Sequence, residues 1–110
     1  MGTDAQSALS AALDRLWIQY LPLMRERVEV LEAAARDFAL GPISVDRQQA
    51  AQAAAHKLAG VLGTFGLTRG TAQARELEIM YSRPNDADAA LAERLANIAA
   101  EIHTIIDSRK

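Results

Sequence analysis

Apolar residues recur every three or four positions in five stretches of the chain, and this spacing constrains the fold more than any other feature. Residues three or four apart lie on one face of an α-helix, so each stretch predicts a helix with one buried side. No segment shows the strict alternation of polar and apolar residues that is typical of a half-buried strand. The predicted fold class is therefore all-α. The expected helices cover residues 5–20, 23–40, 45–64, 68–81 and 86–108.

Turn-forming residues separate the expected helices. Pro22 can either kink a helix or open a second helix at its first turn. We expect the second outcome, so that residues 5–20 form a short additional N-terminal helix that acts as a lid. Short connections join the other four helices, which must then run antiparallel as an up-and-down four-helix bundle. The residues expected to cap helices are Ser44 or Asp46, Thr68, and Asn85 or Asp86.

Composition excludes several classes of function. A length of 110 residues fits a single domain over residues 1–110. The chain has no Cys and two His, so it has no thiol nucleophile and we expect no metal site. A net charge of -2 gives no reason to expect nucleic-acid binding. No apolar stretch is long enough to span a membrane and no signal-peptide pattern is present, so we expect a cytoplasmic protein. A compact bundle with a polar outer face is expected to be a monomer.

His56 lies on the side of its predicted helix that is opposite to the apolar stripe. At about 100° per residue, His56 points about 160° away from Leu58, the centre of that stripe. Gly inside a helix costs about 0.5–1 kcal/mol relative to Ala, so stability does not explain glycines on this exposed side. Their use would be clearance, because a second protein could then reach the imidazole. The small or polar residues that share this side are Gln49, Ala53, Gly60 and Gly63.

His103 also points outward by the same projection. Asp107 lies four residues later, where an ion pair on one helix face is expected. The projection alone does not separate the two histidines. Only His56 has glycines around it, and this favours His56 as the functional residue.

The residues around His56 resemble the histidine-containing phosphotransfer (HPt) domains of bacterial phosphorelays. The segment 55–66 reads AHKLAGVLGTFG. The HPt motif has a Gly four residues after its His, a second Gly near the end of that helix and a third before the next helix. Gly60, Gly63 and Gly66 match these three positions, and the resemblance covers nearly the whole chain.

This resemblance implies a phosphoryl carrier. His56 would attack the aspartyl phosphate of a receiver domain through Nε2 and pass the group to another receiver. The expected partners are receiver domains and, as a further candidate, a hybrid histidine kinase. No cofactor is expected, because the Mg²⁺ for the chemistry belongs to the receiver. The alternative is a module of the same fold that docks with receiver or kinase domains without carrying phosphate.

The resemblance also assigns roles to neighbouring residues. A Glu or Gln on the following helix contacts the His in this family, and Glu78 has the matching offset, although a solvated helix charge is the competing interpretation. Many HPt domains carry Lys three residues after the His, where this chain has Ala59; Lys57 could stabilise the phosphate instead. No nucleotide-binding loop is present, so no kinase activity of the chain itself is expected. The expected docking residues are Gly60, Gly63, Gln49, Ala53 and Ala59.

Two further expectations concern apolar side chains. Leu23 or Val61 is expected to contribute to an apolar docking patch beside His56. Large side chains must fill the volume between Ala-rich helices. The aromatic residues expected in the core are Trp17, Tyr20, Phe38 and Phe65.

Overall fold

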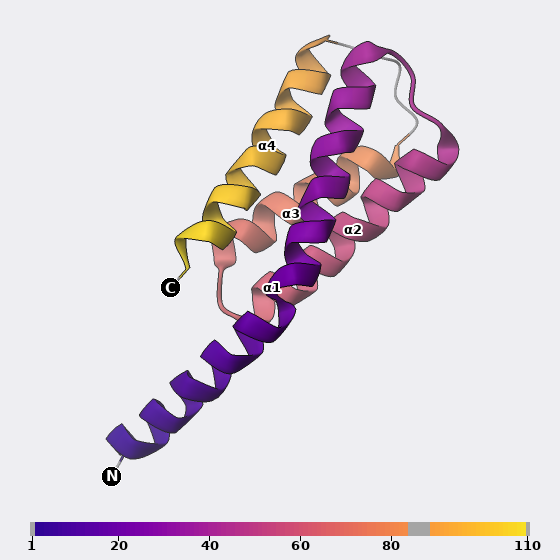
Figure 1. Cartoon of the computed structure of the whole chain (residues 1–110). Coiled ribbons are helices and arrows are strands. Elements are labelled where there is room, and N and C mark those ends of the chain that lie inside the picture. Colours follow the sequence, from indigo (N-terminus) through magenta and orange to yellow (C-terminus); the bar gives the residue numbers. More distant parts are fainter. Residues whose placement is uncertain (1, 84–88, 110) are drawn as a thin grey trace.

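The computed structural model describes residues 2–83 and 89–109, and over these residues the chain is helical without any strand. The all-α class is confirmed. Four helices run up and down in chain order, with α2 packed along α3 and α1 packed along α4 (Figure 1). The helix bounds are α1 Gly2–Leu40, α2 Val45–Thr64, α3 Thr68–Ser82 and α4 Ala89–Ser108.

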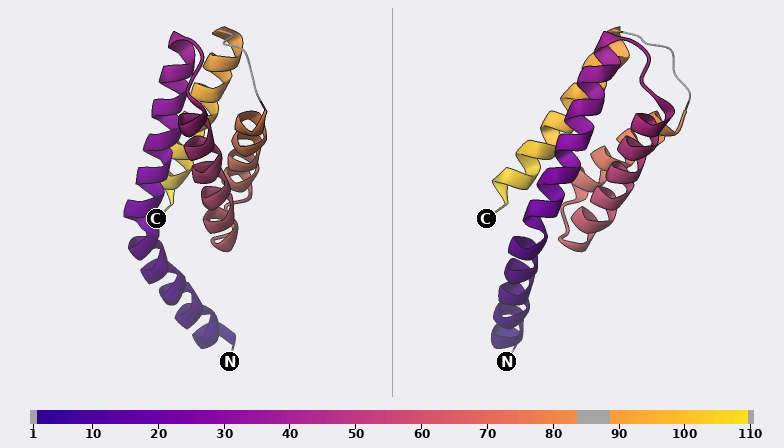
Figure 2. Two further views of the ribbon diagram at one scale, coloured as in Figure 1. Left: turned by 90° about the vertical axis from the view of Figure 1, so that its right-hand side faces the viewer. Right: turned by 45° about the vertical axis from the view of Figure 1, so that its right-hand side comes forward.

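The expected short N-terminal helix is wrong, because α1 continues through Pro22 without a break. A proline inside a helix removes one backbone hydrogen bond and bends the rod, and packing on both sides can hold the helix together. Trp17 and Met24, one on each side of Pro22, are both buried in the core. Figure 2 shows that α1 bends and that its N-terminal part projects past the other helices. This part therefore does not form a lid.

The ends of the helices bear out one expected cap and contradict another. The hydroxyl of Ser44 accepts a hydrogen bond of 3.1 Å from the backbone N–H of Arg47, as expected of an N-cap. Thr68 does not cap α3, because the N-cap residue is Leu67, which makes no side-chain cap. The expected caps Asn85 and Asp86 lie outside the described residues.

The turn between α2 and α3 requires its last glycine. Gly66 has φ +71°, a backbone conformation that L side chains rarely adopt. The turn closes when the N–H of Leu67 donates to the carbonyl of Leu62 over 3.0 Å, and the N–H of Gly66 donates to the carbonyl of Gly63. This pattern ends α2 and reverses the chain in a few residues. As a result α3 lies directly alongside α2.

The core consists of apolar side chains from all four helices. Many of the buried positions are Ala, which lets the helices approach closely. Polar side chains join α3 and α4 at the surface: Arg69 and Gln73 both donate to Glu101, and Arg94 pairs with Glu76. The largest fully buried side chains are Met24, Leu31, Leu58, Leu62, Leu77, Ile102 and Ile106.

The aromatic residues only partly follow the sequence prediction. Trp17 and Phe38 are buried, and Phe65 is partly buried with its ring edge-on to Trp17 at a centroid distance of 5.1 Å. Tyr20 is wrong as a core residue, because its side chain is exposed.

Candidate functional site

His56 stands on the exposed side of α2, and 71% of its side-chain surface is open to solvent. Its Nδ1 lies 2.8 Å from Oε2 of Glu78, which α3 presents from alongside. A carboxylate can only accept, so this contact places the imidazole proton on Nδ1 and leaves the lone pair on Nε2. Among the described residues, Nε2 has no hydrogen-bond partner. The structure thus brings together the two residues that the sequence interpretation paired.

An open groove runs beside His56 between α1 and α2. Its walls are mostly apolar, and both Leu23 and Val61 contribute to it. Arg27 is a cation in this groove that the sequence analysis missed, although its position one turn after Leu23 on the same helix face could have indicated it. The residues that line the groove are Tyr20, Leu23, Arg27, His56, Lys57, Gly60, Val61, Thr64 and Phe65.

Contacts within this chain do not require a glycine at position 60 or at position 63, the two glycine positions beside His56. A Cβ built on Gly60 would meet no atom within 4 Å, and a Cβ on Gly63 would meet only Thr71 at 3.6 Å. Both residues are exposed, so a side chain there would extend into the space in front of the site. Gly70 differs, because its Cβ would lie 3.1 Å from Leu62 and 3.3 Å from Ile105. The sequence analysis did not single out Gly70, and its close packing is visible only in the tertiary structure.

The remaining predicted residues fall into two groups. Gln49, Ala53 and Lys57 are exposed on α2, and Lys57 lines the same groove as His56. Ala59 is wrong as a docking residue, because it is buried with 2% of its surface exposed. Since α2 packs against both α1 and α3, its buried stripe is wide enough to include this position.

His103 differs from His56 in that both of its ring nitrogens face carboxylates. Nδ1 lies 3.3 Å from Glu32 and Nε2 lies 3.1 Å from Asp107, the partner predicted from the sequence. Arg25 reaches the same Asp107 at 3.5 Å. Neither nitrogen of His103 presents a free lone pair to solvent. The geometry therefore separates the two histidines, which helix projection could not do.

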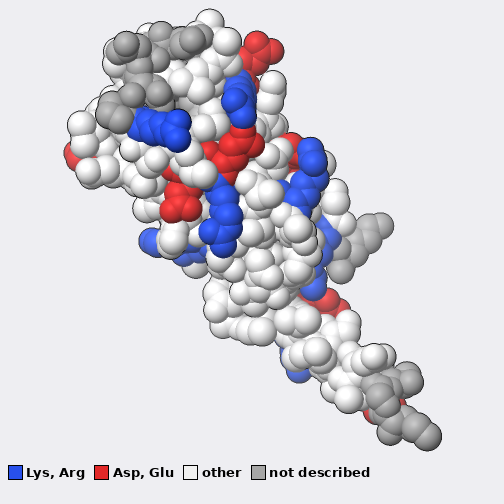
Figure 3. All heavy atoms as spheres, turned by 180° about the vertical axis from the view of Figure 1, so that it is seen from behind, with Lys and Arg blue, Asp and Glu red and all other residues white. Residues whose placement is uncertain are grey.

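No group of three or more His, Asp or Glu side chains in the part of the chain that the structure describes is arranged to hold a metal ion, and none of its helices is long and apolar enough to cross a membrane. On the face shown in Figure 3, acidic and basic side chains are interspersed over the bundle. No large field of one sign appears on that face.

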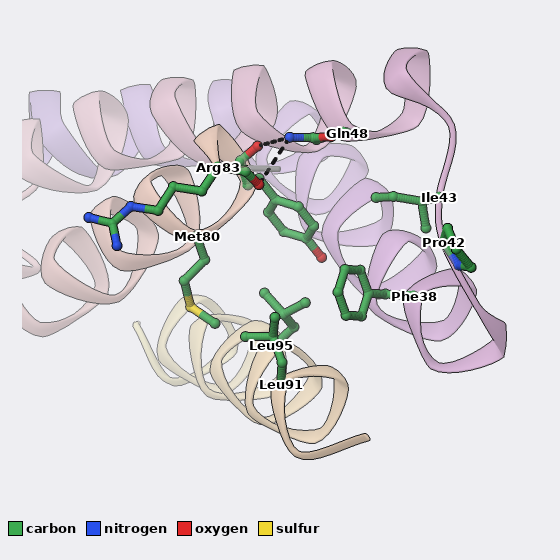
Figure 4. A pocket seen from close by; sticks show the side chains of 9 residues that line it. Phe38, Pro42, Ile43, Gln48, Met80, Arg83, Leu91 and Leu95 are labelled. Atoms are coloured by element: carbon green, nitrogen blue, oxygen red, sulfur yellow. Dashed lines mark hydrogen bonds between the residues drawn. The ribbon is translucent and has the colours of Figure 1, made fainter. Parts of the chain in front are cut away.

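A second cavity lies near the junction of α1 and α2. Phe38, Ile43 and Leu95 line it together with residues of α3, as Figure 4 shows. The Gln48 side chain closes one side by donating to the backbone carbonyls of Tyr81, at 2.8 Å, and of Arg83. This cavity contains no residue of the His56 groove.

The fold and the site together define a small helical module that presents one exposed imidazole, which a carboxylate on the next helix orients. The model of the Hpt domain family matches residues 15–107, and the chain belongs to this family. Protein RcaC of Microchaete diplosiphon is 37% identical over 76 residues, which are 69% of this chain and 12% of RcaC. The chain thus spans a small part of that relative. No solved structure matches the chain.

Membership in this family has consequences for function. Hpt domains serve histidine phosphotransfer in two-component signalling. They are phosphocarrier modules rather than catalysts, and they interact with receiver domains and histidine kinases.

Proposed function

We propose that His56 accepts a phosphoryl group from the aspartyl phosphate of one receiver domain and passes it to the aspartate of another. The observation that carries this proposal is the 2.8 Å contact between Nδ1 of His56 and Glu78, which leaves Nε2 without a partner among the described residues on a side chain that lines the groove. A nucleophile in a phosphorelay needs its lone pair directed at an incoming domain. His103 has no such nitrogen, because carboxylates face both sides of its ring.

The transfer balances without an additional reactant. The Nε2 lone pair attacks phosphorus, the bond from phosphorus to the aspartyl oxygen breaks, and aspartate leaves as a carboxylate. The ring then carries the phosphoryl group on Nε2 and the proton on Nδ1. The negative charge of Glu78 faces the positive charge that the ring acquires. Transfer to the second receiver reverses these steps.

This chain contributes alignment and local charge to the reaction. Phosphoryl transfer depends mainly on positioning the reacting atoms and on stabilising the charge of the transferred group. Lys57 and Arg27 line the groove beside His56, and we assign them to the phosphoryl oxygens. The proposal assigns the Mg²⁺ to the receiver, so that this chain uses no cofactor. We also propose that the protein acts in the cytoplasm as a monomer and has no kinase activity of its own.

The test is a transfer experiment with a receiver domain that carries radioactive phosphate. The wild-type protein should acquire label that is labile in acid and stable in alkali, as expected of phosphohistidine. His56→Gln should acquire none, and His103→Gln, as the matched control, should be labelled like the wild type. Label on His56→Gln would contradict the proposal. Equal signalling output from the wild type and His56→Gln, with equal receiver binding, would indicate the docking module that carries no phosphate.

A further inference from the structure

The N-terminal half of α1 carries an apolar stripe that the rest of the described chain leaves largely exposed. Leu9 is 62% exposed, Leu16 39% and Tyr20 40%, although all are large apolar side chains. The stripe, defined as Leu9, Leu13, Leu16, Tyr20 and Leu23, has successive spacings of four and three residues. Such spacing keeps side chains on one line along a helix. An exposed row of this kind marks a surface that another molecule covers.

The stripe runs directly into the His56 groove. Tyr20 and Leu23 belong to the stripe and also line the groove with His56. At about 100° per residue, all five members lie within about 80° of one another around α1. Because α1 is continuous through Pro22, the stripe and the groove form one surface.

The size of a protein interface determines how much of the stripe a docked receiver would cover. A stable interface buries about 800 Å² on each partner, which corresponds to a disc roughly 30 Å across. Tyr20 already lines the groove with His56, and the helical rise places Leu16 only about 6 Å beyond Tyr20 along α1. Leu9 lies about 16 Å beyond Tyr20. A domain that fills the groove as far as Tyr20 therefore reaches Leu16 about one helical turn farther along α1, whereas Leu9 lies about three turns beyond Tyr20.

The projecting part of α1 has few charged side chains and is anchored at its base, and both properties suit the binding of an apolar partner surface. Between residues 4 and 20 the charged side chains are Asp4, Asp14 and Arg15. Arg109, just after the end of α4, holds the base of this part, because it lies 3.3 Å from Asp14 and 4.7 Å from the centre of the Trp17 ring. A preformed surface loses less entropy on binding than a mobile one.

We propose that the receiver domain docked at His56 also packs on Leu16 and Tyr20, so that the projecting half of α1 forms one wall of the receiver-binding surface. This inference rests on the proposed function, because the receiver must approach His56 for the transfer. The occupant is the receiver rather than a second copy, since the same surface contains the nucleophile and continues past it.

The experiment compares three single substitutions by Gln, which is a good helix former. Leu16→Gln lies inside the expected contact area. Leu9→Gln lies on the same stripe beyond the contact area, and Ile18→Gln, at a position 70% exposed, lies on the opposite face of α1. The probe is a receiver domain that transfers label to the wild-type protein. Its dissociation constant and transfer rate are measured for each variant, and the phosphorylation of His56 by the small donor phosphoramidate is measured alongside.

Leu16→Gln should weaken receiver binding about fivefold to tenfold and should slow transfer at low receiver concentration. Leu9→Gln and Ile18→Gln should remain within about twofold of the wild type. All three should react normally with phosphoramidate, because His56 itself is unchanged.

Two results would overturn the inference while the proposed function stands. One is an affinity of Leu16→Gln equal to that of Ile18→Gln while both accept label. The other is a wild-type dimer, seen by sedimentation, that Leu9→Gln or Leu16→Gln dissociates without a change in receiver affinity, since a second copy would then cover the stripe. Absence of label on the wild type from every receiver would instead overturn the proposed function, and this inference with it.

Discussion

At the scale of single residues, the proposed function depends most on the contact between His56 and Glu78. Only 26% of the Glu78 side chain is exposed to solvent, whereas most of the His56 side chain is exposed. The carboxylate is therefore held in place while the imidazole meets solvent. Such an arrangement selects one tautomer before a partner arrives, which removes that cost from the transfer.

Replacing Glu78 by Ala should slow transfer to His56 about tenfold, which corresponds to the loss of about 1.4 kcal/mol. Glu78→Gln should keep part of the rate, because its amide oxygen can still accept from Nδ1–H. The measurement is the labelling rate together with ¹⁵N chemical shifts of the ring, which report the tautomer. Glu76→Ala is the control, since Glu76 pairs with Arg94 instead. Equal rates for Glu78→Ala and Glu76→Ala would assign Glu78 to the solvated surface.

Tyr81 provides a pH-dependent prediction. Burial raises the pKa of Tyr81 to about 12, because the ionised phenolate would lose its hydration. In the unfolded chain the phenol of Tyr81 has a pKa of about 10. The folded state therefore keeps its full stability below about pH 10 and loses stability as the pH rises from there toward 12. Tyr81→Phe cannot ionise at this position and should lose less stability over that interval. Urea unfolding between pH 8 and 11.5 measures the difference.

The neutral hydroxyl of Tyr81 is itself unsatisfied. Its oxygen is buried and has no hydrogen-bond partner among the described residues. Tyr81→Phe should therefore be at least as stable as the wild type at pH 7, because no hydrogen bond is lost. Tyr20→Phe is the control at an exposed tyrosine. Parallel pH curves for the two variants would show that ionisation of Tyr81 does not limit stability.

At the scale of helices, glycines have two different uses in α2 and α3. Gly60 faces open space beside the nucleophile, whereas Gly70 lets α3 approach side chains of α2 and α4. In the proposed function the absence of a side chain at Gly60 leaves room for a docked receiver, whereas Gly70 is a packing requirement. The same amino acid thus has opposite consequences when it is replaced.

Gly70→Val should lower the free energy of unfolding by about 1–3 kcal/mol, since its side chain would overpack Leu62 and Ile105. Gly60→Val should stay within about 0.5 kcal/mol of the wild type, because helix propensity changes little between Gly and Val and nothing lies nearby. Urea unfolding of both variants measures this contrast. The prediction fails if Gly60→Val is destabilised as much as Gly70→Val.

At the scale of the whole molecule, Arg109 connects the segment after α4 to α1 at the base of its projecting part. Its guanidinium contacts Asp14, 95 residues earlier, and lies over the rings of Trp17 and Phe65. Only 17% of the Arg109 side chain is exposed, so the contact is better shielded from solvent than an ordinary surface pair. The direction of the projecting part of α1 depends on this contact and on the bend at Pro22.

Arg109→Ala should lower the free energy of unfolding by about 1 kcal/mol, through the lost ion pair and cation–π contacts. It should also speed hydrogen exchange in residues 10–20, because the base of the projecting part is released. Arg69→Ala, which removes a more exposed pair on α3 and α4, is the control and should leave exchange in residues 10–20 unchanged. Unchanged hydrogen exchange in residues 10–20 of Arg109→Ala would mean that α1 keeps its direction without the contacts of Arg109.

The sequence predicted those parts of the site that depend on the phase of one helix. His56 opposes Leu58 on α2, and this relation follows from local geometry alone. The prediction that Ala59 is an exposed docking residue was wrong, because helix projection does not tell how much of a helix the neighbouring helices cover. Arg27 was missed for a similar reason, since its place in the groove depends on how α1 packs against α2.

The sequence by itself determined the all-α class and the orientation of His56, and it narrowed the N-cap of α2 to Ser44 or Asp46, because helix propensity, capping and periodicity act within a few residues. Only the tertiary structure decided that α1 continues through Pro22, that its apolar stripe stays largely exposed, and that Glu78 lies within hydrogen-bond distance of Nδ1 of His56. These features depend on contacts between helices far apart in the chain. Packing energy on both sides of Pro22 outweighs one lost hydrogen bond, and no local pattern records that balance.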